Sequence, residues 1–218
     1  PSSAASDVYK RQMLKLHGIL GSNYYGLTKA ALLEKGLEFE EVNSPPSQES
    51  DYLQKSPMGK VPALETEDGF ISESYAIIDY LERVQPEPAL LPHDAFKRAK
   101  SLELSRHLEL DVELVARRCL FAAFYGGKAS DETRKRTQKD LVKGVKAVGI
   151  LTKCEPFIMG SEFTLTDLTA YYTFGLAGDI AKKMFDIDIL DEQPEIKDLM
   201  SMLANRESIK RVAADQAN

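Results

Sequence analysis

The sequence predicts an α/β domain with a mixed sheet, followed by an all-helical domain. Across residues 13–84, short segments of alternating polarity are interspersed with segments of helical periodicity, in the order β-α-β-α-β-β-α. From residue 95 onward, to residue 218, apolar residues recur at the three- and four-residue spacing of helices. The stretch between them, QPEPALLPHD at 85–94, is rich in proline and is predicted to be a linker.

The first half of the α/β domain contains two expected strands and two expected helices. Residues 13–17 alternate and predict a strand, and residues 24–35 predict a helix that stops at Gly36. A second strand is expected at 37–42, because polar and apolar residues alternate there again. A short helix at 48–55 completes this half.

The stretch 56–81 predicts two short strands joined by a polar turn, and then an amphipathic helix. Pro62, after Val61, stands at the head of the first of these strands, where its missing N–H suits an edge or a fixed bend, often with a cis bond. Glu73 and Ser74 open the helix. Because a helix start leaves N–H groups without partners, a serine there indicates a place where an anion can bind.

The second domain is expected to consist of a long first helix and four further helices. Thr164, followed three residues later by Asp167, is close to a capping box at the start of one of them. The predicted helices span 95–125, 131–153, 165–181, 194–205 and 207–214.

The long helix at 95–125 carries two adjacent apolar stripes, which make a face wider than one packing contact requires. The first stripe is expected to pack within the helical domain or at a dimer contact. It consists of Leu108, Val112, Val115, Cys119 and Ala122, and the second of Leu114, Phe121 and Tyr125, with Arg118 among them.

Composition excludes several classes of function. The net charge of −6 argues against a nucleic-acid partner, because no basic surplus is available to neutralise phosphates. No apolar run approaches the roughly 20 residues of a membrane helix. Residues 1–12 are polar and unlike a secretory signal, so we expect a disordered tail or a remnant of cloning, with Met13 as the natural start.

The few cysteines and histidines argue against a disulfide framework and against a metal site. Cys119 and Cys154 form no C-x-x-C motif, which fits a reducing, cytoplasmic location. The histidines have no partner at the spacing of metal ligands, so no metal is expected. They are His17, His93 and His107.

The order of elements and three short motifs resemble the cytosolic glutathione S-transferase superfamily, over nearly the whole chain from Met13. The motifs are KVPAL at 60–64, ESYAI at 73–77 and TLTD at 164–167. The resemblance implies a thioredoxin-like N-terminal domain, an all-α C-terminal domain and glutathione as co-substrate. It also implies a homodimer, a cytoplasmic location and a role in detoxification.

The resemblance further implies a glutathione site. Val61, before Pro62, matches the residue whose backbone pairs with the cysteinyl part of the tripeptide. Ser74 matches the residue that binds the γ-glutamyl carboxylate, and Glu73 would face the ammonium group. Lys60 matches a position that contacts the tripeptide.

The residue that activates the thiol is expected between the first strand and the first helix. Ser22 matches the position used by serine-type members, with Asn23 as an alternative. The end of the strand has no tyrosine and the loop has no cysteine, which disfavours the tyrosine and cysteine types. Ser22 could also be a plain helix cap, and Tyr24 or Tyr25 could line the pocket.

The expected reaction is attack by the glutathione thiolate on small hydrophobic electrophiles. A non-catalytic glutathione-binding or protein-interaction module of the same fold is the alternative, as is a glutathione-dependent peroxidase or isomerase. An apolar wall with Arg118 as a polar element would bind the electrophile, although aromatic residues at helical spacing could equally belong to a core. The wall would consist of Ile19, Leu20, Leu114, Phe121 and Tyr125.

Overall fold

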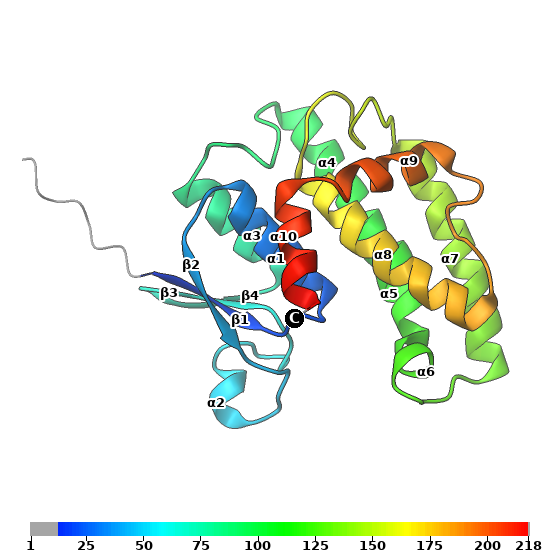
Figure 1. Cartoon of the computed structure of the whole chain (residues 1–218), viewed down its shortest axis with the longest axis horizontal. Helices are drawn as coiled ribbons and strands as arrows, with labels where there is room; N and C mark the ends of the chain where they lie inside the picture. Colours follow the sequence, from blue (N-terminus) through cyan, green and yellow to red (C-terminus); the bar gives the residue numbers. More distant parts are fainter. Residues whose placement is uncertain (1–12, 218) are drawn as a thin grey trace, which may run out of the picture. The chain divides into compact units, whose positions relative to one another are not determined.

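The computed structural model describes residues 13–217, and the predicted tail at 1–12 lies outside the described residues. The chain forms two compact units that divide after Val84 (Figure 1). Each unit is described by itself.

Within its described residues, the first unit contains a four-stranded mixed sheet in the order β2-β1-β3-β4. Strand β1 runs parallel to β2, whereas β3 runs antiparallel to both β1 and β4. The C-terminal ends of β1 and β4 therefore lie at the same edge of the sheet as the N-terminal end of β3. The strands are β1 (Leu14–Gly18), β2 (Phe39–Asn43), β3 (Ala63–Thr66) and β4 (Gly69–Ser72).

Two helices cover one face of this sheet. They are α1 (Asn23–Glu34) and α3 (Ser74–Val84), and they lie side by side, whereas the single turn α2 (Ser50–Leu53) lies apart from them (Figure 1). Their apolar side chains meet those of the sheet in one buried cluster. It contains Leu16, Tyr25, Leu32, Leu64, Ile77 and Leu81.

The second strand begins later than the sequence predicts, because the end of α1 uses the residues before it. Gly36 has a positive φ of 62° and donates its N–H to Leu33, while Leu37 donates to Leu32 at 3.1 Å. This pair of bonds is a Schellman motif, which closes the helix. The N–H of Leu37 is therefore not available to a strand, and β2 starts at Phe39 instead of residue 37. The predicted helix at 48–55 is likewise shortened to α2.

The second unit is helical, apart from turns and one isolated bridge among its described residues. Helix α8 packs against α4, α7 and α9, and against a π-helical turn that follows α4. The longer helices are α4 (Ala95–His107), α7 (Asp131–Leu151), α8 (Leu165–Phe185), α9 (Pro194–Leu203) and α10 (Glu207–Gln216).

The expected single helix at 95–125 is wrong in detail, because it is interrupted twice. A π-helical segment η1 separates α4 from the short helix α5, and a 3₁₀ turn η2 separates α5 from the short helix α6. Gly144 of α7 lies against the backbone of Asp111, and a Cβ at that glycine would come within 2.0 Å of the Asp111 carbonyl oxygen. The segments are η1 (Leu108–Glu113), α5 (Leu114–Ala116), η2 (Arg117–Cys119) and α6 (Leu120–Phe124).

The first apolar stripe nevertheless packs inside the helical unit. Leu108, Val112 and Cys119 are fully buried and Val115 is nearly so, whereas Ala122, the last member of the stripe, is half-buried. This is one of the two outcomes expected for this stripe. Both Cys119 and Cys154 are free thiols.

None of the helices within residues 13–217 is both long and apolar enough to cross a membrane. In the same range, no three His, Cys, Asp or Glu side chains gather where they could hold a metal ion.

Candidate functional site

Three predicted segments meet at one edge of the sheet in the first unit. The loop with Ser22 follows β1, the bend at Pro62 precedes β3, and Ser74 follows β4. The strand directions place all three at the same edge. Ser74 also contacts the helix that follows the Ser22 loop, because its hydroxyl donates to the carbonyl oxygen of Tyr24 in the first turn of α1 at 3.5 Å, the long limit of a hydrogen bond.

Ser22 is the N-cap of α1. Its backbone is extended, with φ −87° and ψ 125°, and its Oγ accepts a long hydrogen bond of 3.3 Å from the N–H of Tyr25. The Ser22 hydroxyl therefore uses a lone pair for the cap, and no acceptor for its proton is found among residues 13–217. A hydroxyl that caps a helix can at the same time donate to an anion, and the dipole of α1 favours negative charge at this end. Asn23 is the first helical residue and, like Ser22, is half-buried.

The bend before β3 has the predicted form, since the peptide bond between Val61 and Pro62 is cis. The pairing of β1 with β3 ends at His17 and Ala63, so the peptide groups of Val61 lie beyond it. An extended peptide can be added at such a place by backbone hydrogen bonds. The side chain of Lys60 is exposed, and its carbonyl oxygen accepts a bond of 3.1 Å from the Tyr52 hydroxyl.

The start of α3 combines an exposed acid with a buried hydroxyl. Glu73 has a φ of 70°, which is the left-handed region that residues other than glycine seldom adopt. Its carbonyl oxygen accepts the first helical bond, from Ile77 at 3.0 Å, while its side chain is exposed. Ser74 is buried. A strained residue at a helix start is a feature that clusters at ligand sites.

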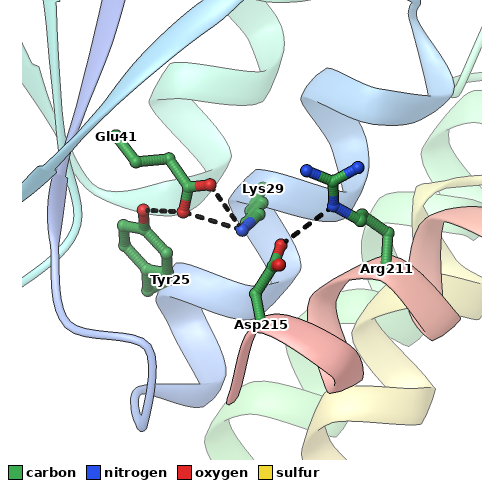
Figure 2. Close-up of polar contacts among 5 residues, drawn as sticks. All are labelled: Tyr25, Lys29, Glu41, Arg211 and Asp215. Atoms are coloured by element: carbon green, nitrogen blue, oxygen red, sulfur yellow. Dashed lines mark hydrogen bonds and ion pairs between the residues drawn. The ribbon is translucent and has the colours of Figure 1, made fainter. Parts of the chain in front are cut away.

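Tyr25 does not line a pocket, so that part of the sequence interpretation is wrong. Its ring belongs to the buried core of the first unit, and its hydroxyl donates to Oε2 of Glu41 at 2.7 Å (Figure 2). Lys29, one turn further along α1, places its Nζ at 2.6 and 2.7 Å from the two oxygens of the same carboxylate. Tyr24 is half-buried.

This cluster of Tyr25, Lys29 and Glu41 is the feature of the site region that sequence reasoning missed. A lysine inside a helix is ordinarily solvent-exposed. The available signal was the spacing, because Lys29 stands four residues after Tyr25 and so shares its helix face.

The predicted wall residues are described within their own units. In the first unit, Ile19 is half-buried and Leu20 is exposed. In the second unit, Leu114 is 39% exposed, Phe121 71% and Tyr125 69%. The second stripe therefore does not belong to the core of the helical unit. The rings of its two aromatic residues contact each other, with centroids 5.4 Å apart.

Arg118 is held by a carboxylate of the neighbouring helix. Its Nη1 donates to Oδ2 of Asp140 in α7 at 2.7 Å. This hydrogen bond holds the pKa of Asp140 below its usual value. Figure 2 also draws a similar pair within α10, where Arg211 donates to Asp215 at 3.2 Å.

Comparison with known proteins identifies the family. A family model described as the N-terminal domain of glutathione S-transferases matches residues 16–89. A glutathione S-transferase of Pseudomonas putida is 41% identical over 204 residues, which cover 94% of this chain and 93% of that protein. The chain belongs to the glutathione S-transferase family.

Two further similarities are informative. A glutathione transferase of Populus trichocarpa has the same fold, with a TM-score of 0.79 at 19% identity, covering 94% of this chain and 99% of that one. A probable maleylacetoacetate isomerase of Drosophila melanogaster is 48% identical over 54 residues, which is 25% of this chain and 22% of that protein.

Family membership confirms the main expectations drawn from the sequence. The first unit has the mixed sheet and helices of the glutathione S-transferase N-terminal domain, and the second is helical. The protein is an enzyme of the glutathione transferase class, whose co-substrate is glutathione.

Proposed function

We propose that this glutathione transferase is of the serine type and conjugates the glutathione thiolate to small hydrophobic electrophiles. The observation that carries the proposal is the Ser22 hydroxyl, which caps α1 as an acceptor and keeps its proton for a further partner. It is supported by the position of Ser22 at the same edge of the sheet as Pro62 and Ser74. Asn23 is the alternative donor.

The glutathione contacts follow from the same edge. We propose that the cysteinyl part of the tripeptide pairs with the backbone of Val61 in extended form. The γ-glutamyl carboxylate would bind at Ser74, where the start of α3 offers N–H groups and a hydroxyl. The exposed Glu73 would meet the ammonium group, and Lys60 would contact the rest of the tripeptide.

A hydrogen bond from Ser22 and the dipole of α1 can together supply the free energy needed to ionise the thiol. A thiol with a pKa of about 8.5 is only about 3% ionised at neutral pH, and lowering that pKa by about 2 units requires about 2.7 kcal/mol. One hydrogen bond to a charged group contributes about 1.5–3 kcal/mol. The helix dipole adds about 0.3–1 kcal/mol. Ser22 therefore needs only to donate a hydrogen bond, and need not ionise.

We further propose that exposed apolar side chains take part in binding the electrophile, and the candidates are given for each unit by itself. Leu20 and its neighbour Ile19 are the candidates in the first unit. Arg118 would be the polar element in the second. The apolar candidates there are Leu114, Phe121 and Tyr125, whose exposure supports a role in binding rather than in packing.

The test of this function is conjugation of a generic aryl halide, followed together with glutathione binding. The parent protein should form the conjugate, and Ser22→Ala should lose about 100-fold in kcat with a much smaller change in affinity for glutathione, because the hydrogen bond that keeps the bound thiol ionised is removed. A parent protein that binds glutathione but conjugates none of several electrophiles would support the non-catalytic module instead. If Asn23→Ala loses about 100-fold in kcat and Ser22→Ala does not, Asn23 is the donor to the thiolate.

Isomerase activity is the second candidate, favoured by the similarity to a probable maleylacetoacetate isomerase. A thiolate can add to an activated double bond, allow rotation about the resulting single bond, and leave again. Glutathione is then regenerated, whereas conjugation consumes it. Counting free thiol during turnover separates the two activities. A peroxidase would instead convert glutathione to its disulfide.

Homodimer formation, a cytoplasmic location and a role in detoxification also remain proposals, and they rest on family resemblance.

A further inference from the structure

The first unit contains a polar cluster that none of the proposed glutathione contacts uses. It consists of Tyr25 and Lys29 on α1 and Glu41 on β2 (Figure 2). We propose that this cluster positions Ser22, and that the catalytic rate depends on it although none of its side chains touches the thiol. The inference rests on the function proposed for Ser22.

The cluster is costly to build, which indicates that its geometry is well defined. Lys29 is only 1% exposed, and a buried ammonium group must be paired to be tolerated. Glu41 supplies that pairing with both of its oxygens, at 2.6 and 2.7 Å. The Tyr25 hydroxyl binds the same carboxylate at 2.7 Å. Two residues one helical turn apart are thus fixed to a single point on the neighbouring strand.

Tyr25 transmits this constraint to both ends of the loop that carries Ser22. At the beginning of the loop, its ring lies against Gly18, where a Cβ would come within 2.3 Å of Cδ2 of the tyrosine. At the end of the loop, its N–H donates to Oγ of Ser22. The side chain of Tyr25 therefore fixes the residue whose backbone orients the Ser22 hydroxyl.

The other end of α1 provides an internal control. Lys35 is also a buried lysine, and its Nζ lies 2.5 Å from Oε1 of Glu82 in α3. This second pair resembles the first in chemistry and in its buried lysine, although the side chain of Glu82 is 8% exposed and that of Glu41 is 37% exposed. It lies at the C-terminal end of the helix, away from Ser22, so it should contribute to stability alone.

The experiment compares Tyr25→Phe and Glu41→Gln with Tyr80→Phe and Glu82→Gln. Tyr80 is a tyrosine of α3 that packs against the same core cluster, and Glu82 is the partner of the control lysine. Urea unfolding, the KM for glutathione, kcat with an aryl halide, and the ionisation of bound glutathione by thiolate absorbance against pH are measured for all four.

We expect Tyr25→Phe and Glu41→Gln to lower kcat about tenfold and to raise the pKa of the bound thiol by about one unit, with KM changed less than about threefold. Tyr80→Phe and Glu82→Gln should leave both kcat and the thiol pKa as in the parent, whatever their stability. If all four variants alter kcat only in proportion to their loss of stability, the cluster is structural and the inference is wrong.

The outcome also separates this inference from the proposed function. If Ser22→Ala retains the thiol pKa of the parent, Ser22 is not the donor, and both ideas fail. If Ser22→Ala raises that pKa while Tyr25→Phe and Glu41→Gln do not, the function stands and only the positioning role is overturned.

Discussion

Two helix starts that look alike in the sequence differ in how their hydrogen-bonding groups are used. At the start of α8, Thr164 Oγ1 accepts from Thr166, and Asp167 accepts from Thr164 and from Ile158, both at 2.8 Å. Thr164 and Asp167 are both buried, and together they form a complete capping box.

At the start of α3, no capping box is formed by Glu73 and Ser74. Glu73 is exposed and left-handed, and the Ser74 hydroxyl turns to the carbonyl of Tyr24 over a long 3.5 Å contact. Hydroxyl and acidic residues at a helix start can therefore have either of two roles. A helix start satisfied by its own side chains stabilises the fold, whereas one whose donors are not satisfied in this way is suited to binding a ligand.

The largest effect is expected from breaking the satisfied helix start. Asp167→Asn keeps the size of the side chain but points an amide donor at a buried N–H, so it should lower the free energy of unfolding by about 3 kcal/mol. Urea unfolding with an unchanged m-value measures this. Asp198→Asn, at an exposed position on α9, is the control and should cost less than about 0.5 kcal/mol. Equal losses would refute the distinction.

Removing the hydroxyl at each of the two helix starts should have opposite effects on ligand affinity and stability. Ser74→Ala should weaken glutathione binding about 10- to 100-fold, because a hydrogen bond to a carboxylate is lost, while unfolding changes by less than about 0.5 kcal/mol. Thr164→Ala should do the reverse, costing about 1 kcal/mol of stability with no change in affinity. Titration calorimetry and urea unfolding of both variants decide the matter. The comparison fails if the two variants behave alike.

A smaller effect should follow from the backbone of Glu73. Glycine accommodates a φ of 70° without strain, so Glu73→Gly is expected to raise the free energy of unfolding by about 1 kcal/mol while lowering glutathione affinity. Asp186, with a φ of 54° at the end of α8, is the matched position, and Asp186→Gly should leave affinity unchanged. Affinity retained in Glu73→Gly would remove this residue from the site.

The smallest effect concerns the stability of the fold at low pH. The hydrogen bond with His17 lowers the pKa of Glu65, so this carboxylate stabilises the fold above its ordinary pKa of about 4.3 and ceases to do so as the pH falls through the lowered value. Burial raises the pKa of Asp167, so the ionisation of this residue affects stability in the opposite direction. Its contribution to stability is lost as the pH rises through the raised pKa.

Glu65→Gln should therefore cost up to about 1 kcal/mol at pH 6 and progressively less toward pH 3, as measured by urea midpoints at each pH. Glu67→Gln, in the exposed turn after β3, is the control and should show no such trend. A penalty for Glu65→Gln that does not change with pH would contradict this assignment.

Periodicity and turn residues predicted the kind and order of the elements, because these depend on neighbours within a few positions. The Schellman motif after α1 illustrates the limit, since the bond from Leu37 to Leu32 shortened the next strand. The π-helical segment η1 was not predicted, and the carbonyl of Asp111 within it lies against Gly144, a residue of another helix that local reasoning does not consider.

The candidate site shows the same division. Short motifs located Pro62, Glu73 and Ser74, since each marks a strand or helix end. The cluster of Tyr25, Lys29 and Glu41 was missed, because whether a lysine is buried depends on what the opposing strand provides.

The sequence by itself determined the kind and order of the strands and most helices, and which helix starts carry hydroxyl or acidic side chains. Only the tertiary structure decided which of these side chains bond within their own first turn and which contact a distant segment. The physical reason is that a helix-start donor finds its partner either in its own first turn or in a segment that the strand order brings near. Pairing and burial of that second kind join residues far apart in sequence, as with Ser74 and Tyr24.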